Sequence, residues 1–111
     1  MNKLTVLVNE EVVFEFDRDM EFTDEQLGFL RGMDTDMDNG IKIDGELIVK
    51  PDSTQRATFV SMNLIKGLQQ ENEAIIQASC AYLVNRYPAL IEVHVNDDGD
   101  AVKIELIEDK H

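Results

Sequence analysis

The stretch Leu4-Thr5-Val6-Leu7-Val8-Asn9-Glu10-Glu11-Val12-Val13-Phe14-Glu15-Phe16 decides the fold class, because apolar residues recur at every second position on both sides of a polar break. Such a period of two places successive side chains on opposite faces of a sheet, so this stretch predicts a hairpin of residues 4–8 and 12–16. A two-residue loop would set Val8 opposite Glu11, whereas a three-residue loop, 9–11, keeps the apolar rows aligned. The pairs expected for the three-residue loop are Leu4 with Phe16, Val6 with Phe14 and Val8 with Val12.

A second hairpin is expected at the other end of the sequence. Residues 91–95 and 102–106 repeat the period of two, and pairing Val95 with Val102 aligns their apolar rows around the loop Asp97-Asp98-Gly99-Asp100. The two hairpins predict one mainly antiparallel sheet of about four strands.

Helical signals fill the middle of the chain. Thr23 with Gln26 forms a capping box for a first helix, and Gly40 can end it with a left-handed turn. Asp52 or Ser53 caps a second helix over about residues 54–70, and Asn72 caps a third, which Pro88 stops. Asp44-Gly45 favours a small hairpin within 41–49. The prediction is a single α+β domain, 1–111, of order ββα(ββ)ααββ with three helices on one face of the sheet.

Two glycines interrupt the first predicted helix. Gly28 and Gly32 lie four residues apart and share a face, and each weakens the helix by about 1 kcal/mol relative to alanine. Close packing at this face is the interpretation we favour over a merely short helix.

The composition is strongly acidic. The formal net charge is −13, and residues 10–46 hold thirteen acidic residues against three basic ones. This charge repels nucleic acid and anionic membranes and favours a basic protein, a cationic ligand or a metal ion, if it does more than maintain solubility. No stretch is long and apolar enough to span a bilayer.

The single cysteine, Cys80, cannot form an internal disulfide and belongs to no metal-ligand spacing. Its apolar helical neighbours predict a packed, inert thiol. The N-terminus lacks the apolar run of a signal peptide, so a cytoplasmic location is expected.

The acidic segment, residues 34–46, resembles the start of a calcium loop. Asp34, Asp36 and Asp38 occupy positions one, three and five, but position twelve is Gly45 and Glu46 comes one residue late. The metal candidates are Asp34, Asp36, Asp38 and Glu46, and the prediction is that no metal or cofactor binds. Three aspartates at a helix C-terminus oppose the helix dipole. Either the helix ends near Met33 and these aspartates cap turns, or a cationic neighbour such as Arg31, Lys42 or Arg56 compensates their charge.

Two surfaces are candidates for protein binding. The acidic segment would attract a basic partner, and the solvent face of the sheet would support a homodimer. The residues assigned to them are Asp34, Asp36, Asp38, Asp44 and Glu46 on the first and Leu7, Val13 and Ile107 on the second.

The pattern Met33-Asp34-x-Asp36-Met37-Asp38-x-Gly40-Ile41, followed by Pro51-Asp52 and Gln55-Arg56-Ala57-x-Phe59-Val60, resembles small acidic bacterial proteins of unassigned function. The resemblance implies a bacterial cytosolic setting and no mechanism. No acid–base pair, nucleophile pair or cofactor loop stands out, so an enzyme is the least favoured class. The leading hypothesis is a protein-interaction or regulatory module without catalysis, and calcium binding at residues 34–46 is the alternative.

Overall fold

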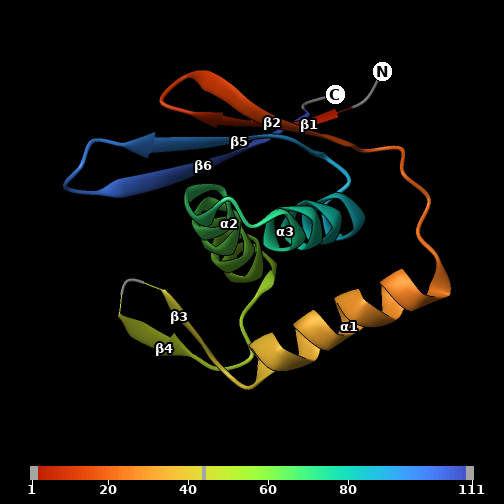
Figure 1. Cartoon of the computed structure of the whole chain (residues 1–111). Helices are drawn as coiled ribbons and strands as arrows, with labels where there is room; N and C mark the ends of the chain where they lie inside the picture. The colour runs from red at the N-terminus through yellow and green to blue at the C-terminus, as the bar shows by residue number, and fades with distance from the viewer. Residues whose placement is uncertain (1–2, 44, 110–111) are drawn as a thin grey trace. The chain divides into compact units, whose positions relative to one another are not determined.

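The computed structural model describes residues 3–43 and 45–109, and its elements follow the predicted order (Figure 1). Three helices with a four-stranded and a two-stranded sheet make this an α+β protein. The elements are β1 (Lys3–Val8), β2 (Glu11–Asp17), α1 (Asp24–Asp38), β3 (Ile41–Ile43), β4 (Glu46–Ile48), α2 (Ser53–Gln70), α3 (Glu73–Arg86), β5 (Leu90–Asp97) and β6 (Val102–Glu108).

The described residues separate into two compact units. The sheet unit contains residues 3–20 and 80–109, and the helical unit contains residues 21–79. The boundary between them falls within α3, after Ser79.

The sheet unit is built on four strands in the order β2-β1-β5-β6 (Figure 1). The two hairpins β1–β2 and β5–β6 are antiparallel, and β1 pairs with β5 in parallel. A parallel pair requires a crossover connection, which here is the chain from the end of β1 through β2 to the start of β5. The mainly antiparallel sheet predicted from the terminal hairpins is therefore confirmed.

The first hairpin differs from its predicted loop. The pairs Leu4–Phe16 and Val6–Phe14 are confirmed, but Leu7 pairs with Val12 and Val8 pairs with Glu11, so the three-residue loop is wrong. Asn9 and Glu10 form a two-residue turn with φ of 51° and 71°. Val13 is the extra residue of a bulge that restores the apolar register beyond the turn. A tight turn combined with a bulge satisfies the same side-chain pattern as a longer loop.

The second hairpin is shifted by two residues from the predicted register. Val95 pairs with Ile104 rather than Val102, and Val102 pairs with Asp97. A slip of two residues keeps every side chain on its face, so polarity cannot distinguish the two registers. The turn selects the observed register, because Asp98 Oδ1 accepts the amides of Asp100 and Ala101 at 3.0 and 2.9 Å. The Ala101 amide, followed by that of Asp100, holds the pKa of the Asp98 carboxyl below its usual value.

The core of the sheet unit uses one face of the strands. The side chains on this face are fully buried or nearly so, as are those of the α3 segment in the same unit. They are Leu4, Val6, Val93 and Val95 in the strands and Cys80, Tyr82 and Leu83 in the helix.

Asn9 joins the ends of the two central strands. Its Nδ2 donates to the Asp97 carbonyl at 3.1 Å, and its Oδ1 accepts the Asp97 amide at 2.9 Å. We predict that Asn9→Ala lowers the free energy of unfolding by about 1 kcal/mol, because it removes both bonds and strains the left-handed backbone. Asn9→Gly removes only the bonds and is expected to lose less. Urea denaturation of both variants checks this, and an alanine variant as stable as wild type would contradict it.

The helical unit begins with two capping boxes. Thr23 accepts the Gln26 amide at the start of α1, and Asp52 accepts the Gln55 amide at the start of α2. In each, the glutamine side chain accepts the amide of the cap residue. These reciprocal bonds satisfy amides that lack partners within the helix. The Thr23 box was predicted from the sequence, and of the two caps proposed for the second helix, Asp52 is the one that the structure shows.

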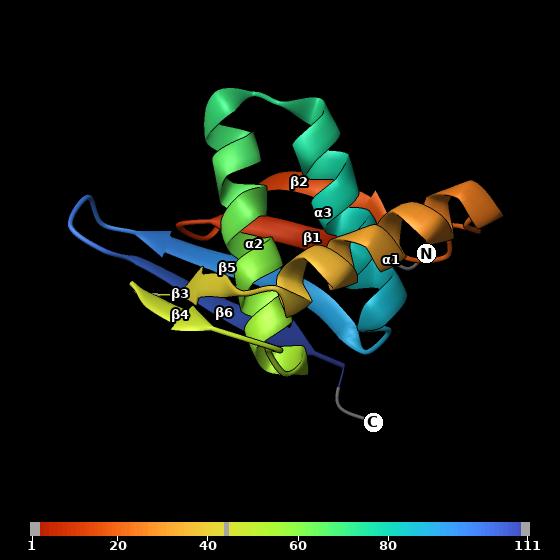
Figure 2. The ribbon, with the colours of Figure 1, turned by 90° about the horizontal axis from the view of Figure 1, so that it is seen from below.

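The end of α2 lies close to the start of α3, and the two run antiparallel (Figure 2). Glu71 turns the chain with φ of 54°, and Asn72 donates its amide to the Gly67 carbonyl at 2.8 Å. A Cβ on Gly67 would lie 3.0 Å from Ile75 Cγ2 and 3.1 Å from Ile76 Cγ1. By contrast, a Cβ on Gly32 would meet nothing within 4 Å, and one on Gly28 only the end of Arg31 at 3.6 Å. The close packing predicted at Gly28 and Gly32 is therefore wrong, and it occurs at Gly67.

Candidate functional site

The acidic segment begins in the last turns of α1, within the helical unit. Leu30 and Met37 bury one side of this helix, and Ile41 anchors the chain beyond it. Asn39 is the C-cap, and Gly40 follows with φ of 128°, a value that favours glycine. This local structure turns the chain into the small hairpin β3–β4, whose pairs Ile41–Ile48 and Ile43–Glu46 fit the predicted turn at residues 44 and 45.

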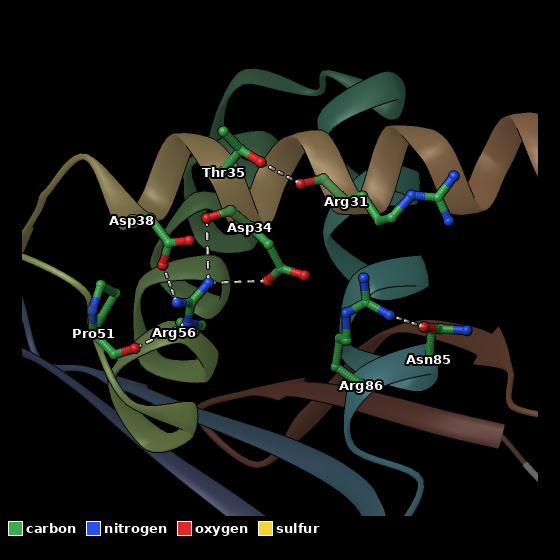
Figure 3. Close-up of polar contacts among 8 residues, drawn as sticks. All are labelled: Arg31, Asp34, Thr35, Asp38, Pro51, Arg56, Asn85 and Arg86. Carbon is green, nitrogen blue, oxygen red and sulfur yellow. Dashed lines mark hydrogen bonds and ion pairs between the residues drawn. The ribbon is translucent and has the colours of Figure 1, made fainter.

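Arg56, in the first turns of α2, lies against the C-terminal end of α1 (Figure 3). Its Nη1 donates to the Asp34 carboxylate at 3.1 Å and to the Asp34 carbonyl at 3.2 Å, and its Nη2 pairs with the Asp38 carboxylate. Its Nε donates to the Pro51 carbonyl at 3.0 Å. The planar guanidinium thus connects two aspartates of α1 to the chain that enters α2.

Arg56 compensates the negative charge at the C-terminal end of α1. Asp34 and Asp38 oppose the dipole at the end of α1, and the charge of Arg56 compensates both. The Arg56 side chain is only 18% exposed, so its pairing with Asp34 is shielded from solvent. Of the three cations proposed from the sequence, Arg56 is the neighbour that the structure provides.

The remaining residues of the acidic segment differ in position. Asp36 lies on the exposed side of α1, Glu46 is exposed at the start of β4, and Asp44 lies outside the described residues. The structure thus brings Asp34 and Asp38 together around an arginine and leaves Asp36 and Glu46 facing solvent. Within residues 3–43 and 45–109, no three His, Cys, Asp or Glu side chains are grouped so that they could hold a metal ion.

Calcium titration tests the alternative function at this segment. We predict that millimolar calcium causes no saturable amide shift over residues 34–46, because Asp34 and Asp38 already pair with a cation. An Arg56→Gln variant titrated in parallel shows whether freeing these carboxylates creates an affinity. A saturable shift in the wild-type protein would support the cation-binding alternative.

The candidate residues of the sheet face do not form one patch. Leu7 pairs with Val12, and the exposed Val13 follows at the bulge, so these three lie at the β1–β2 end of the face. Ile107 lies on β6, beyond Glu92 of β5. His94 and Glu92 are joined by a 2.8 Å contact between Nε2 and Oε1, which places polar groups between the apolar ones.

The exposure of several large apolar side chains was not predicted from the sequence. Phe29 on α1 is 59% exposed, Leu47 on β4 is 61% exposed, and Val49, just after β4, is 59% exposed. Phe29 falls outside the apolar stripe of its helix, so helical periodicity contains the signal for its exposure. Leu47 packs close to Gly40, since a Cβ added to Gly40 would lie 3.1 Å from Leu47 Cδ1. This contact could not be predicted from the sequence.

Cys80 is fully buried, as its helical neighbours predicted. Burial raises the pKa of its thiol to about 12, because the thiolate would lose its hydration. We predict that iodoacetamide at pH 8 modifies the folded protein at least about a thousandfold more slowly than the urea-unfolded chain. Mass spectrometry of timed samples measures both rates, and rapid alkylation of the folded protein would contradict the assignment of an inert thiol.

No protein-family model, curated protein or solved structure matches this chain. Within the described residues, none of the helices combines the length and apolar character needed to cross a membrane. The class that the fold defines is a small acidic α+β protein.

Proposed function

We propose that this protein is a cytosolic protein-interaction module that acts by binding, without catalysis, and that its partner presents a basic surface. The inert state of its only thiol and the use of Arg56 to pair Asp34 and Asp38 support a binding role over a chemical one. A single cysteine in an internal, reduced state also suits the cytosol.

The observation that carries the proposal is the surface of the helical unit. Residues 21–79 include eleven acidic and five basic residues, for a net charge of −6. In the same unit, the large apolar side chains of Phe29, Leu47 and Val49 are each more than half exposed. Exposed apolar side chains combined with a strong charge of one sign are typical of protein-binding surfaces.

The chemistry of the partner follows from this surface. Lysine and arginine on the partner would be steered by Asp36 and Glu46, and apolar groups would cover Leu47 and Phe29. Steering by exposed charges is screened by salt, whereas burial of apolar side chains is not. Association is therefore expected to slow as salt increases, while the dissociation rate changes less.

Affinity capture from the native cell extract, followed by binding measurements with the recovered protein, tests this function. Asp36→Asn combined with Glu46→Gln is expected to slow association several-fold at low salt, and Leu47→Ser to speed dissociation about tenfold. Asp34 and Asp38 are left intact, since changing them would disturb the Arg56 contacts.

The matched control is Val12→Ser, which alters an exposed apolar side chain of the sheet unit. It is expected to leave binding unchanged. A partner that is acidic, or one whose binding survives both helical-unit variants, would overturn the proposal.

A further inference from the structure

The two edges of the four-stranded sheet are unequal. β2 forms one edge, and it carries the Val13 bulge and the charges of Glu11, Glu15 and Asp17 with no basic residue. Bulges and like charges are devices that prevent an edge strand from pairing with another chain. β6 forms the other edge over seven residues, and its own backbone has no extra residue in its pairing with β5.

The apolar row of β6 is incompletely covered. Ile104 and Leu106 share a face with Val95 and Val93, their partners on β5. Val93 and Val95 are fully buried, whereas Ile104 and Leu106 are half-buried and Val102 is 49% exposed. The apolar side chains of this face are thus covered at β5 and only partly covered at β6, where pairing with one further strand would cover them.

The sequence of β6 is complementary to itself. When two copies run antiparallel with Ile104 opposite Ile104, each Lys103 lies opposite Glu105 of the second copy. The same register places Val102 opposite Leu106 in both directions. Opposite charges and apolar pairs directly across an antiparallel ladder stabilise it. In this register the charged pairs lie on one face of the extended sheet and the apolar pairs on the other, as they do in the monomer.

We propose that β6 pairs with β6 of a second copy, centred on Ile104, to give a homodimer with one continuous eight-stranded sheet. Neighbouring registers are disfavoured, because a centre at Lys103 sets two lysines opposite each other and a centre at Glu105 sets two glutamates opposite each other. A shift by an odd number of residues would expose the apolar row. Repulsion between two chains of charge −13 opposes the dimer, but salt screens it beyond a Debye length of about 8 Å.

Charge reversal and charge exchange test this register. In sedimentation equilibrium, the wild-type protein is expected to dimerise with increasing concentration. Lys103→Glu or Glu105→Lys alone would place like charges opposite each other twice per dimer, and each is expected to raise the dissociation constant tenfold or more. The double variant K103E/E105K exchanges the charges, restores both pairs, and is expected to return to within about threefold of wild type.

Lys42→Glu makes the same change of charge in the helical unit and is the matched control, expected to leave the dissociation constant unchanged. Far-UV circular dichroism establishes that each variant is folded. A wild-type protein that stays monomeric at millimolar concentration, or a double variant no better than the single ones, overturns the proposal. Protection of β6 amides that appears only when another protein is added would also overturn it, in favour of a heterologous strand.

Discussion

Replacing Arg56 with methionine is expected to lower the free energy of unfolding by about 2–3 kcal/mol. Methionine keeps the apolar length of the side chain but removes the bonds to Asp34, Asp38 and the Pro51 carbonyl. The cost exceeds that of a surface ion pair, because Arg56 and Asp34 are only 18% and 29% exposed and the aspartates are left at the negative end of a helix dipole. Urea unfolding followed by circular dichroism measures the change.

Arg31→Met is the matched control, since it removes the same charge from an exposed position on α1. Its effect is expected to stay within about 0.5 kcal/mol. A double-mutant cycle of Arg56→Met with Asp38→Asn isolates the pair, and we expect a coupling of about 1 kcal/mol. Equal losses in Arg56→Met and Arg31→Met would show that net charge, and not the arginine geometry, determines the result.

The second large effect is expected at Gly67. Gly67→Ala should lower the free energy of unfolding by about 1–2 kcal/mol, even though alanine favours helices by about 1 kcal/mol over glycine. The added Cβ would lie 3.0 Å from Ile75 Cγ2 and 3.1 Å from Ile76 Cγ1. Isoleucine is stiff at χ1, so these neighbours cannot easily turn away, and the start of α3 must shift.

Gly32→Ala serves as the control, because its Cβ would meet nothing within 4 Å. Alanine there is expected to raise the free energy of unfolding by about 0.5–1 kcal/mol through helix propensity alone. Opposite signs for two glycine-to-alanine changes in helices would verify the close approach. A gain in stability at both positions would contradict it.

The parts of the fold that depend on neighbouring residues were predictable. The capping boxes of Thr23 and Asp52, the end of α1 near Gly40 and the strand pairs on either side of residues 44 and 45 all follow from turn and cap chemistry within a few residues. Alternation of apolar residues predicted both terminal hairpins, and the helical signals between them completed the prediction of the α+β class.

Registers were less predictable, for a specific reason. The bulge at Val13 and the Asx-type turn at Asp98 change the number of loop residues without changing which side chains face the core. Polarity fixes the face of a residue and leaves shifts of two residues open. The bonds of Asn9 to Asp97 join residues 88 positions apart, and nothing in the local sequence indicates them.

At the acidic segment, the amino-acid sequence by itself determined the charges and showed that a helix carrying three of them at its C-terminus would need a compensating cation. Only the structure decided that the helix continues to Asp38 and that Arg56 supplies this cation, because folding brings the first turns of α2 beside the end of α1. The tertiary structure likewise decided the close contact at Gly67 and the position of β6 at the edge of the sheet, since both depend on how separate elements pack together. Local chemistry determines elements, and long-range packing determines which of their groups remain available for binding.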